Sequence, residues 1–192
     1  MVALAAPVSA GVIDFTPHDF NVYLSHGSSI TNNHGRSDFT TIHFEVVGTE
    51  RHLTRWVRRW LPDIKTGLDI NYSDIVQPRS WFGHQFGDPD DRVRAEAAYL
   101  FIRNEWRLGG VSTFADLGSG PMWSNRRIPA ATAKGNFNSQ LSLGATLFEN
   151  TRHPIMLGYR FSHISNGGFG ASRNPGLNVH GFFVGARVRK WR

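Results

Sequence analysis

Residues 154–165 alternate regularly between apolar side chains and small or polar ones. The apolar side chains share one parity: Ile155, Leu157, Tyr159 and Phe161. Period-two alternation of this kind is typical of a β-strand whose two faces meet different environments. His163 and Ser165 continue the apolar parity, and residues two apart on a strand lie about 6.5–7 Å apart on the same side. The pattern predicts a strand that ends in a base and a hydroxyl on its apolar face, the minimum for nucleophilic acyl transfer.

Seven other segments alternate in the same way and predict further strands. They cover residues 20–25, 38–47, 66–76, 94–103, 111–118, 136–148 and 178–191. We expect polar loops and turns between them, including residues 27–35, 77–92, 104–110, 119–129 and 149–153. Eight strands is an even number, and it closes a small barrel that leaves no exposed edge.

Residues 51–65 depart from the period of two. Their apolar side chains recur at spacings of three and four, with arginines between them: Leu53, Trp56, Val57, Trp60, Leu61 and Ile64. This spacing predicts an amphipathic helix. Two interpretations stay open: a helix at a lipid interface, with tryptophans in lipid and arginines near head groups, or a packed connection between strands.

Residues 136–148 indicate which side of the barrel faces outward. The small and polar positions share one parity: Asn136, Asn138, Gln140, Ser142, Gly144 and Thr146. The other parity carries the apolar side chains: Phe137, Leu141, Leu143, Ala145 and Leu147. A barrel in lipid has a polar lumen and an apolar exterior, the reverse of a soluble sandwich. We therefore predict an all-β fold, an eight-stranded antiparallel transmembrane β-barrel over residues 11–192.

The order of the connections predicts how the barrel is oriented. If both termini are periplasmic, as in bacterial outer-membrane barrels, the loops after the first, third, fifth and seventh strands are external. These are mostly the long ones. The end of the strand that carries His163 and Ser165 then lies at the external rim of the bacterial outer membrane.

Composition narrows the classes of partner and of chemistry. The 192-residue chain has no cysteine, which excludes disulfides and thiolate catalysis. Its net charge of +6 favours an anionic partner. We expect this partner to be a lipid surface and not nucleic acid, because the arginines are scattered over loops. Residues 1–10 are small and apolar and end in Val8-Ser9-Ala10, so we interpret them as a truncated signal-peptide remnant; a disordered N-terminus is the alternative.

The His-x-Ser pair is by itself a weak motif, because its residues are common and Asn166-Gly167-Gly168 is also typical of a turn. Its position is more informative. A polar pair on the lipid-facing side of a barrel costs solvation free energy, so it is not expected there without a use. Asn178 and His180 share the parity of the outward-facing Phe182 and return beside the pair across the hairpin. A third group could therefore orient the base.

Three segments carry a family resemblance: Leu117-Gly-Ser-Gly-Pro-Met-Trp-Ser-Asn-Arg-Arg-Ile-Pro129, Phe137-Asn-Ser-Gln-Leu-Ser-Leu-Gly144, and Gly158-Tyr-Arg-Phe-Ser-His-Ile-Ser-Asn-Gly-Gly168 with Asn174-Pro-Gly-Leu-Asn178. They resemble the lipid A 3-O-deacylase (PagL) family, most specifically in Phe-x-His-x-Ser-Asn followed by Asn-x-Gly. The resemblance implies an outer-membrane barrel that hydrolyses the ester-linked 3-hydroxyacyl chain at position 3 of lipid A, the anchor of lipopolysaccharide. It further implies Ser165 as nucleophile, His163 as general base, and Asn166 with Gly168 as oxyanion donors.

One position departs from the family pattern. The family has a glutamate shortly after Asn-x-Gly, on the last strand, to orient the histidine, and the matching place here holds Asn178. Loss of the carboxylate removes charge stabilisation of the imidazolium, although asparagine can still fix a histidine tautomer. We expect a slower enzyme, or one whose third member is Asn178 with help from His180.

The expected mechanism needs no metal and no other cofactor, because serine and histidine suffice for acyl transfer. Arg126, Arg127 and Arg173 are candidates for contacts with the phosphates of lipid A, for which bidentate arginine is suited. The alternative for each of them is a solvated side chain.

Two other functions stay open. A non-enzymatic outer-membrane barrel, structural or adhesive, would carry His163 and Ser165 merely as the end of a strand. A soluble barrel that binds an apolar ligand inside would turn its apolar faces toward the lumen.

Overall fold

The computed structural model describes residues 14–29, 36–61, 64–77, 80–81, 84–85, 92–129, 132–169 and 176–191. The expected signal remnant, residues 1–10, lies outside the described residues, and so does Arg173. No helix in the described part of the chain is long and apolar enough to cross a membrane.

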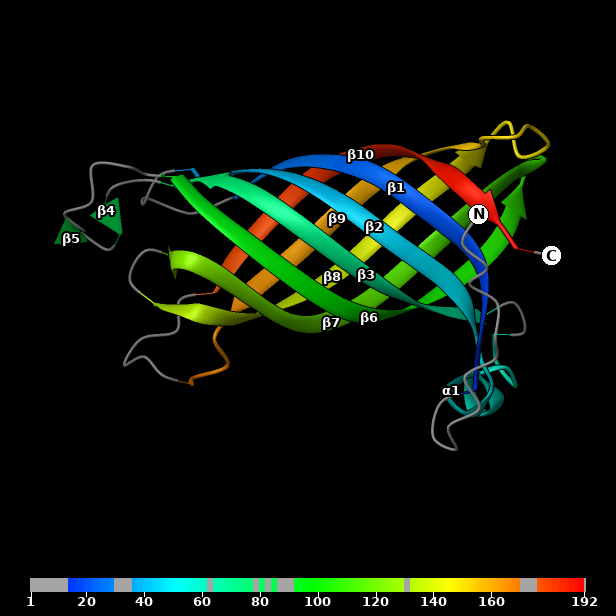
Figure 1. Ribbon diagram of the computed structural model, residues 1–192, viewed down its shortest axis with the longest axis horizontal. Helices are drawn as coiled ribbons and strands as arrows, with labels where there is room; N and C mark the ends of the chain where they lie inside the picture. Colours follow the sequence, from blue (N-terminus) through cyan, green and yellow to red (C-terminus); the bar gives the residue numbers. More distant parts are fainter. Residues whose placement is uncertain are drawn as a thin grey trace, which may run out of the picture.

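Eight long strands close into an antiparallel barrel (Figure 1). They are β1 (Phe15–Ser29), β2 (Asp38–Glu50), β3 (Ile64–Val76), β6 (Arg92–Leu108), β7 (Val111–Ile128), β8 (Ala133–Leu147), β9 (Ile155–Ser165) and β10 (Leu177–Lys190). Each strand pairs with the next of the eight along the chain, and β1 pairs with β10 to close the sheet. The predicted eight-stranded antiparallel barrel is confirmed.

The barrel is apolar outside, and its lumen holds most of the buried polar side chains together with two apolar clusters. Along β8 the polar parity is buried, whereas Leu141 and Leu143 are 46% and 52% exposed. The other strands repeat this pattern with exposed apolar side chains that include Leu24, Ile70, Leu100, Leu117, Leu157 and Phe182. The predicted facing is thus observed, and it suits a barrel whose exterior lies in lipid. It is the reverse of what a soluble barrel with an apolar interior would need.

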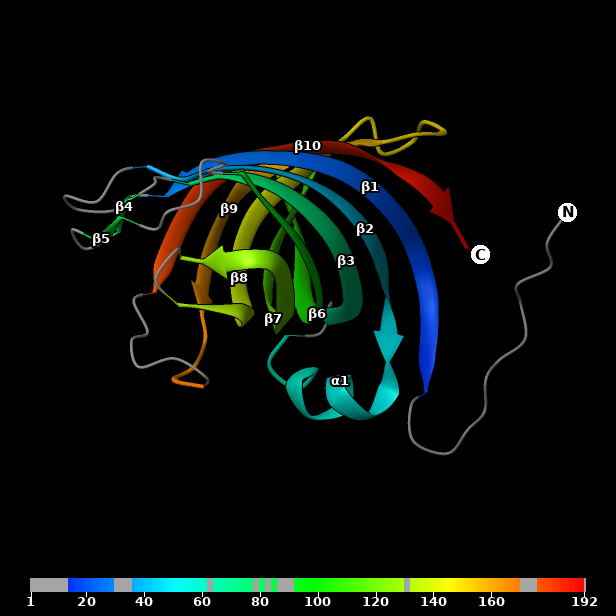
Figure 2. The ribbon, with the colours of Figure 1, turned by 60° about the vertical axis from the view of Figure 1, so that its left-hand side comes forward.

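Four connections lie at one end of the barrel, which we call the loop end: those that follow β1, β3, β7 and β9. The opposite end holds the start of β1 and the end of β10, where the N–H of Trp191 donates to the carbonyl of His18 at 2.7 Å. The connection from β2 to β3 at this opposite end contains α1 (Arg51–Val57), which lies beside the barrel in both views (Figures 1 and 2).

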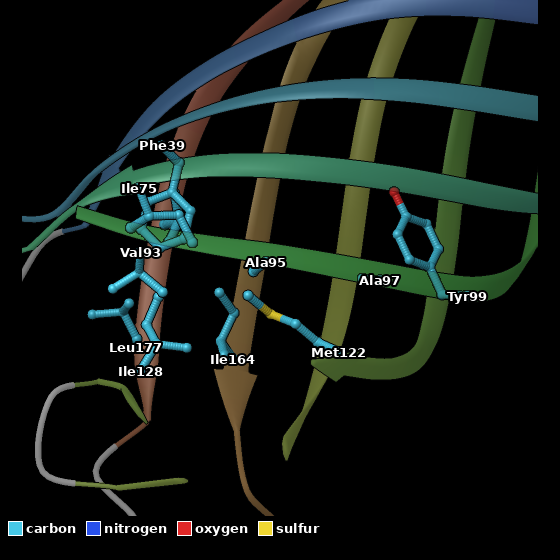
Figure 3. Close-up of a cluster of buried hydrophobic side chains, with 11 residues drawn as sticks. Phe39, Ile75, Val93, Ala95, Ala97, Tyr99, Met122, Ile128, Ile164 and Leu177 are labelled. Carbon is cyan, nitrogen blue, oxygen red and sulfur yellow. The ribbon is translucent and has the colours of Figure 1, made fainter. Parts of the chain in front are cut away.

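Side chains fill the lumen. At the loop end an apolar cluster closes it, and Figure 3 labels ten of its members, among them Phe39, Ile75 and Leu177. Further along the lumen, buried charges pair with one another: Arg103 lies 3.0 Å from Glu45 and 2.7 Å from Asp116. The inside of the barrel is therefore a packed core, as expected for eight strands, and it leaves the outer face as the accessible surface.

The predicted ends of two strands are wrong. The turn expected at residues 104–110 shrinks to Gly109 and Gly110, both with positive φ, because β6 and β7 remain paired from Leu108 and Val111 onward. β7 also continues through the loop expected at residues 119–129 as far as Ile128. Charged and small residues blur the alternation near strand ends, but they leave the backbone hydrogen bonds of the ladder intact.

Two predicted irregular segments also differ. The helix expected over residues 51–65 ends at Val57, and a turn follows it. The loop expected at residues 77–92 contains a short hairpin, β4 (Ser80–Trp81) with β5 (His84–Gln85), which lies beyond the loop end (Figure 2). Neither feature alters the barrel.

Candidate active site

The candidate site lies on the outer face of the barrel, where β9 ends and β10 begins. Asn178 of β10 pairs with His163 of β9, and His163 pairs with Ser139 of β8. Ser139 in turn pairs with Ser119 of β7. These four residues form a row across four adjacent strands, which we call the outer polar row. It interrupts the apolar exterior near the loop end.

Asn178 holds His163 in place. Nδ1 of His163 lies 2.7 Å from Oδ1 of Asn178. An amide oxygen only accepts hydrogen bonds, so Nδ1 donates and Nε2 keeps its lone pair. This is the tautomer that a histidine needs to take a proton from a serine hydroxyl. The structure thus brings together the predicted base and its predicted third member across the hairpin.

Ser165 is the last residue of β9, two positions beyond His163 and on the same side of the sheet. Its side chain is half-buried and lies opposite Phe137 of β8. Among the described residues, the side-chain hydrogen bond of His163 goes to Asn178 and not to Ser165. Nucleophile–base hydrogen bonds are often long or misaligned without substrate, so this arrangement is compatible with His163 as the base toward Ser165.

The chain turns directly after Ser165. The N–H of Phe169 donates to the carbonyl of Asn166 at 2.9 Å, and Gly167 and Gly168 take φ values of 62° and 84°, which favour glycine. Asn166 is buried, and its Oδ1 accepts from the N–H of Gly168 at 2.8 Å. The two predicted oxyanion donors therefore lie just after Ser165, but they are bonded to each other. The Gly168 N–H must leave Asn166 before it can bind an oxyanion.

Ser119 and Ser139 were not predicted as part of the site. Their hydroxyl oxygens lie 2.9 Å apart on the outer face. Ser139 has the parity of Phe137 and Leu141, so the alternation along β8 already places a polar side chain among apolar ones. Because Ser139 lies opposite His163, the outer polar row extends from the base toward β7.

His180 lies outside the outer polar row. It pairs with Phe161, and not with His163 or Ser165 as the return of the hairpin suggested. Its Nδ1 is hydrogen-bonded to the hydroxyl of Tyr159, and its ring meets that of Phe161 edge-on at 5.0 Å. The strand register sets His180 two residues further from the loop end than Asn178, so its described contacts give no support to a role in orienting His163.

Arg126 and Arg127 lie at the end of β7, separated from β9 by β8. Arg126 is half-buried and Arg127 is exposed. The Arg127 carbonyl accepts from the side chain of Gln77 at 3.0 Å, which ties this strand end to the connection after β3. Both arginines are thus at the loop end of the barrel, where a head group would lie, and Arg173 lies outside the described residues.

An open apolar groove of about 620 Å³ lies on the outer face beside Ser165. Residues of β3, β6, β7 and β8 and of the turn after β9 line it, including Ile70, Pro121, Trp123, Phe137 and Phe169. Two of its lining residues adjoin Ser165: Phe137 pairs with Ser165 across the strands, and Asn166 follows it in the chain. Its volume falls in the usual range of ligand sites, and its lining suits a hydrocarbon chain.

A second serine–histidine pair, inside the barrel, was also not predicted. The hydroxyl of Ser25 lies 2.9 Å from Nε2 of His43, and Nδ1 of His43 lies 3.0 Å from Oδ2 of Asp69. Nη1 of Arg160 lies 3.1 Å and 3.3 Å from the two imidazole nitrogens. The adjoining cavity of about 40 Å³ has room for a few water molecules. We call Ser25, His43 and Asp69 the inner triad; it has no space for a lipid.

Metal-binding geometry is not found in the described part of the chain: no three histidine, cysteine, aspartate or glutamate side chains are grouped to hold an ion. The imidazole of His163, the hydroxyl of Ser165 and the backbone N–H groups of the turn that follows are the components that acyl transfer requires.

Comparison with known proteins places the chain. The sequence model of one family, Lipid A 3-O-deacylase (PagL), matches residues 46–187. The solved structure of Neisserial surface protein A (NspA) is 9% identical with a TM-score of 0.59, and the match covers 90% of this chain and 96% of that chain. The structure of the outer membrane enzyme PagL is 15% identical with a TM-score of 0.56, and covers 85% and 97%. No curated protein sequence matches the chain.

Proposed function

Because the chain belongs to the lipid A 3-O-deacylase (PagL) family and folds as an outer-membrane barrel, we propose that it removes the 3-O-linked 3-hydroxyacyl chain of lipid A. The reaction is that of a serine esterase: Ser165 is the nucleophile, His163 is the general base, and Asn178 orients the base. The protein lies in the bacterial outer membrane, and its substrate is the lipid A of lipopolysaccharide.

The hydrogen bond from His163 to Asn178 on the lipid-facing surface is the observation that carries this proposal. It holds Nε2 of His163 on a largely apolar surface, where an unused histidine would lose solvation free energy. The apolar groove beside Ser165 supplies the second requirement, a place for the acyl chain next to the nucleophile. A lipid substrate could reach both the groove and His163 from within the membrane.

The proposed reaction proceeds in two acyl transfers. Nε2 of His163 takes the Ser165 proton while Oγ attacks the ester carbonyl, and N–H groups of the turn at Asn166 and Gly168 hold the oxyanion. The C–O bond to the sugar then breaks, and His163 returns the proton to the departing sugar oxygen. Water, deprotonated by His163, attacks the acyl-serine and releases the 3-hydroxy fatty acid, which restores the Ser165 hydroxyl.

Asn178 differs from the glutamate of the family pattern in charge and in symmetry. An amide brings no negative charge to stabilise the imidazolium that forms when His163 takes a proton. Its two ends also differ, since Oδ1 accepts and Nδ2 donates, and only the observed orientation keeps Nε2 free. We therefore propose an enzyme that works with Asn178 but more slowly than one with a carboxylate there.

Substrate orientation is proposed to come from the loop end. Arg126, Arg127 and Arg173 are candidates for the phosphates of lipid A, since a guanidinium can bind a phosphate through two N–H groups. Arg126 and Arg127 lie at the end of β7, on the groove side of Ser165, where Trp123 of the same strand lines the groove. A head group at this position would leave the acyl chains on the outer face.

Ser165→Ala tests the proposed function directly. Purified wild-type protein in detergent micelles with lipopolysaccharide is expected to release 3-hydroxy fatty acid, and Ser165→Ala to release about 1,000-fold less or none. Ser119→Ala is the matched control, because it removes an outward-facing hydroxyl that lies on β7, two strands away from Ser165. Gas chromatography of the freed acid and mass spectrometry of the lipid A give the readout.

The alternative is a non-enzymatic barrel, structural or adhesive, which the shared fold of Neisserial surface protein A leaves open. It predicts identical lipid A from wild-type and Ser165→Ala protein, with no acid released by either. That result would reject the esterase. Loss of hydrolysis in Ser119→Ala as well as in Ser165→Ala would instead remove the assignment of Ser165 as the nucleophile.

A further inference from the structure

We propose that Gly176 is a positioning residue for His163: the lack of a side chain at this position leaves the space that the imidazole occupies. The inference rests on the proposed function, in which His163 acts as base toward Ser165. Gly176 directly precedes β10, and it has no side chain that could take part in the reaction. Gly176 contributes only the space that the His163 ring occupies.

The space above Gly176 is filled by the His163 ring. A Cβ atom built on Gly176 would overlap Cε1 of His163 and lie 3.1 Å from Nε2 and 3.4 Å from Nδ1. These three imidazole atoms are the nearest heavy atoms to that position. Any side chain at residue 176 would therefore meet the ring before it met anything else, and the ring would have to move.

Strand register relates this space to Ser165. Leu177 pairs with Ile164, and Asn178 pairs with His163. Continued by one residue, this register sets Gly176 opposite Ser165. Gly176 is therefore the next outward-facing position after Asn178 in the direction of the loop end. Asn178 fixes Nδ1, while the Cε1–Nε2 edge lies against Gly176. The imidazole therefore lies between Asn178 and Gly176, on the β10 side of His163.

Backbone conformation does not require glycine at residue 176. The described glycines with positive φ are Gly109, Gly110, Gly167 and Gly168, and Gly176 is not among them. An alanine can adopt the same backbone angles, so its cost arises from the contact with the imidazole. The effect of Gly176→Ala should thus pass through His163 and vanish when the ring is absent.

A double-mutant cycle tests this dependence. We expect Gly176→Ala to lower kcat/KM for release of the 3-hydroxy acid by about 100-fold, because a displacement of roughly 1 Å is enough for such a loss. In the His163→Ala background, the same substitution should leave the residual rate unchanged. Imidazole nitrogen NMR of the folded barrel should show that Gly176→Ala loses the Nδ1–H hydrogen bond to Asn178, while the urea midpoint of unfolding stays the same.

Each outcome supports or overturns the proposal. Full activity in Gly176→Ala, an unchanged imidazole spectrum, or an equal loss in the His163→Ala background would each overturn it. If Gly176→Ala does not fold, the proposal requires that the double variant with His163→Ala folds, and failure of both would also overturn it. If the wild-type protein releases no acid, the proposed function fails, but the imidazole spectrum still decides whether Gly176 seats the ring.

Discussion

Two histidines of this barrel each lie between a serine and an acceptor, one in the lumen and one on the outer face. In the inner triad, hydrogen bonds run without a break from Ser25 through His43 to Asp69. On the outer face, His163 is bonded to Asn178, but the described contacts do not join it to Ser165. By hydrogen bonds alone, the inner set is the more complete catalytic triad.

Accessibility to a substrate gives the opposite ranking of the two sets. His43 and Asp69 are 2% and 0% exposed, and Arg160 lies against the imidazole. Arg160 also donates to the hydroxyl of Tyr23 at 2.6 Å, so the network is closed on itself. The outer polar row borders open surface and the apolar groove. A saturated network stabilises a core, whereas the proposed esterase site has a histidine nitrogen and open space available for a substrate.

Among the substitutions in the inner triad, Asp69→Asn should reduce the stability of the barrel most. It removes the carboxylate beside His43 and Arg160 while it keeps the size of the side chain, so a buried guanidinium loses a counter-charge. We expect the free energy of unfolding to fall by about 3–5 kcal/mol. Urea titration of the barrel in lipid vesicles, followed by tryptophan fluorescence, measures the change.

Hydrolysis by the folded fraction of Asp69→Asn is the control. We expect the rate per folded molecule to equal that of the wild type, because the inner triad has no path to the lipid. A variant that remains as stable as the wild type but loses hydrolysis would place catalysis in the lumen and reverse the comparison.

The sequence predicts most of the barrel because alternation reports which side of each strand meets lipid. Leu141 and Leu143 are exposed and Asn136 and Ser142 are buried, as the parity along β8 requires. Strand length was harder to predict, because Asn104 interrupts the apolar parity of β6 before Trp106 and Leu108 resume it, with Glu105 and Arg107 on the other parity. Their pairing depends on β7, which lies next to them only once the sheet has formed.

The candidate site was predictable where one strand carries it and less so where two strands share it. His163 and Ser165 share one parity of β9, so their side of the sheet could be predicted. A contact between His163 and Asn178 was inferred from the hairpin and the family pattern. In the structure the two residues pair across β9 and β10. The contact between Gly176 and the His163 ring depends on the side-chain conformation of His163, and alternation contains no information about that conformation.

Asn178 gives the next prediction, of intermediate size. Asn178→Ala removes the acceptor that fixes the His163 tautomer, and we expect kcat/KM for acid release to fall by about 10- to 100-fold. Asn178→Glu restores a charged acceptor, and we expect a rate several-fold above that of the wild type at neutral pH. Equal rates for all three proteins would mean that Ser165 and His163 work as a dyad.

Ser25→Ala gives the smallest effect and the sharpest contrast with Ser165→Ala. The Ser25 hydroxyl is hydrogen-bonded to Nε2 of His43, the atom that corresponds to the proposed basic nitrogen of His163. Its loss removes one hydrogen bond in the lumen, so we expect the free energy of unfolding to fall by about 0.5–1.5 kcal/mol and acid release to stay unchanged. Ser165 is half-buried at the end of β9, and we expect its removal to abolish acid release with little change in stability. Urea titration and acid release measured on both variants should therefore give opposite patterns; a loss of hydrolysis in Ser25→Ala would mean that the two serines act in one reaction.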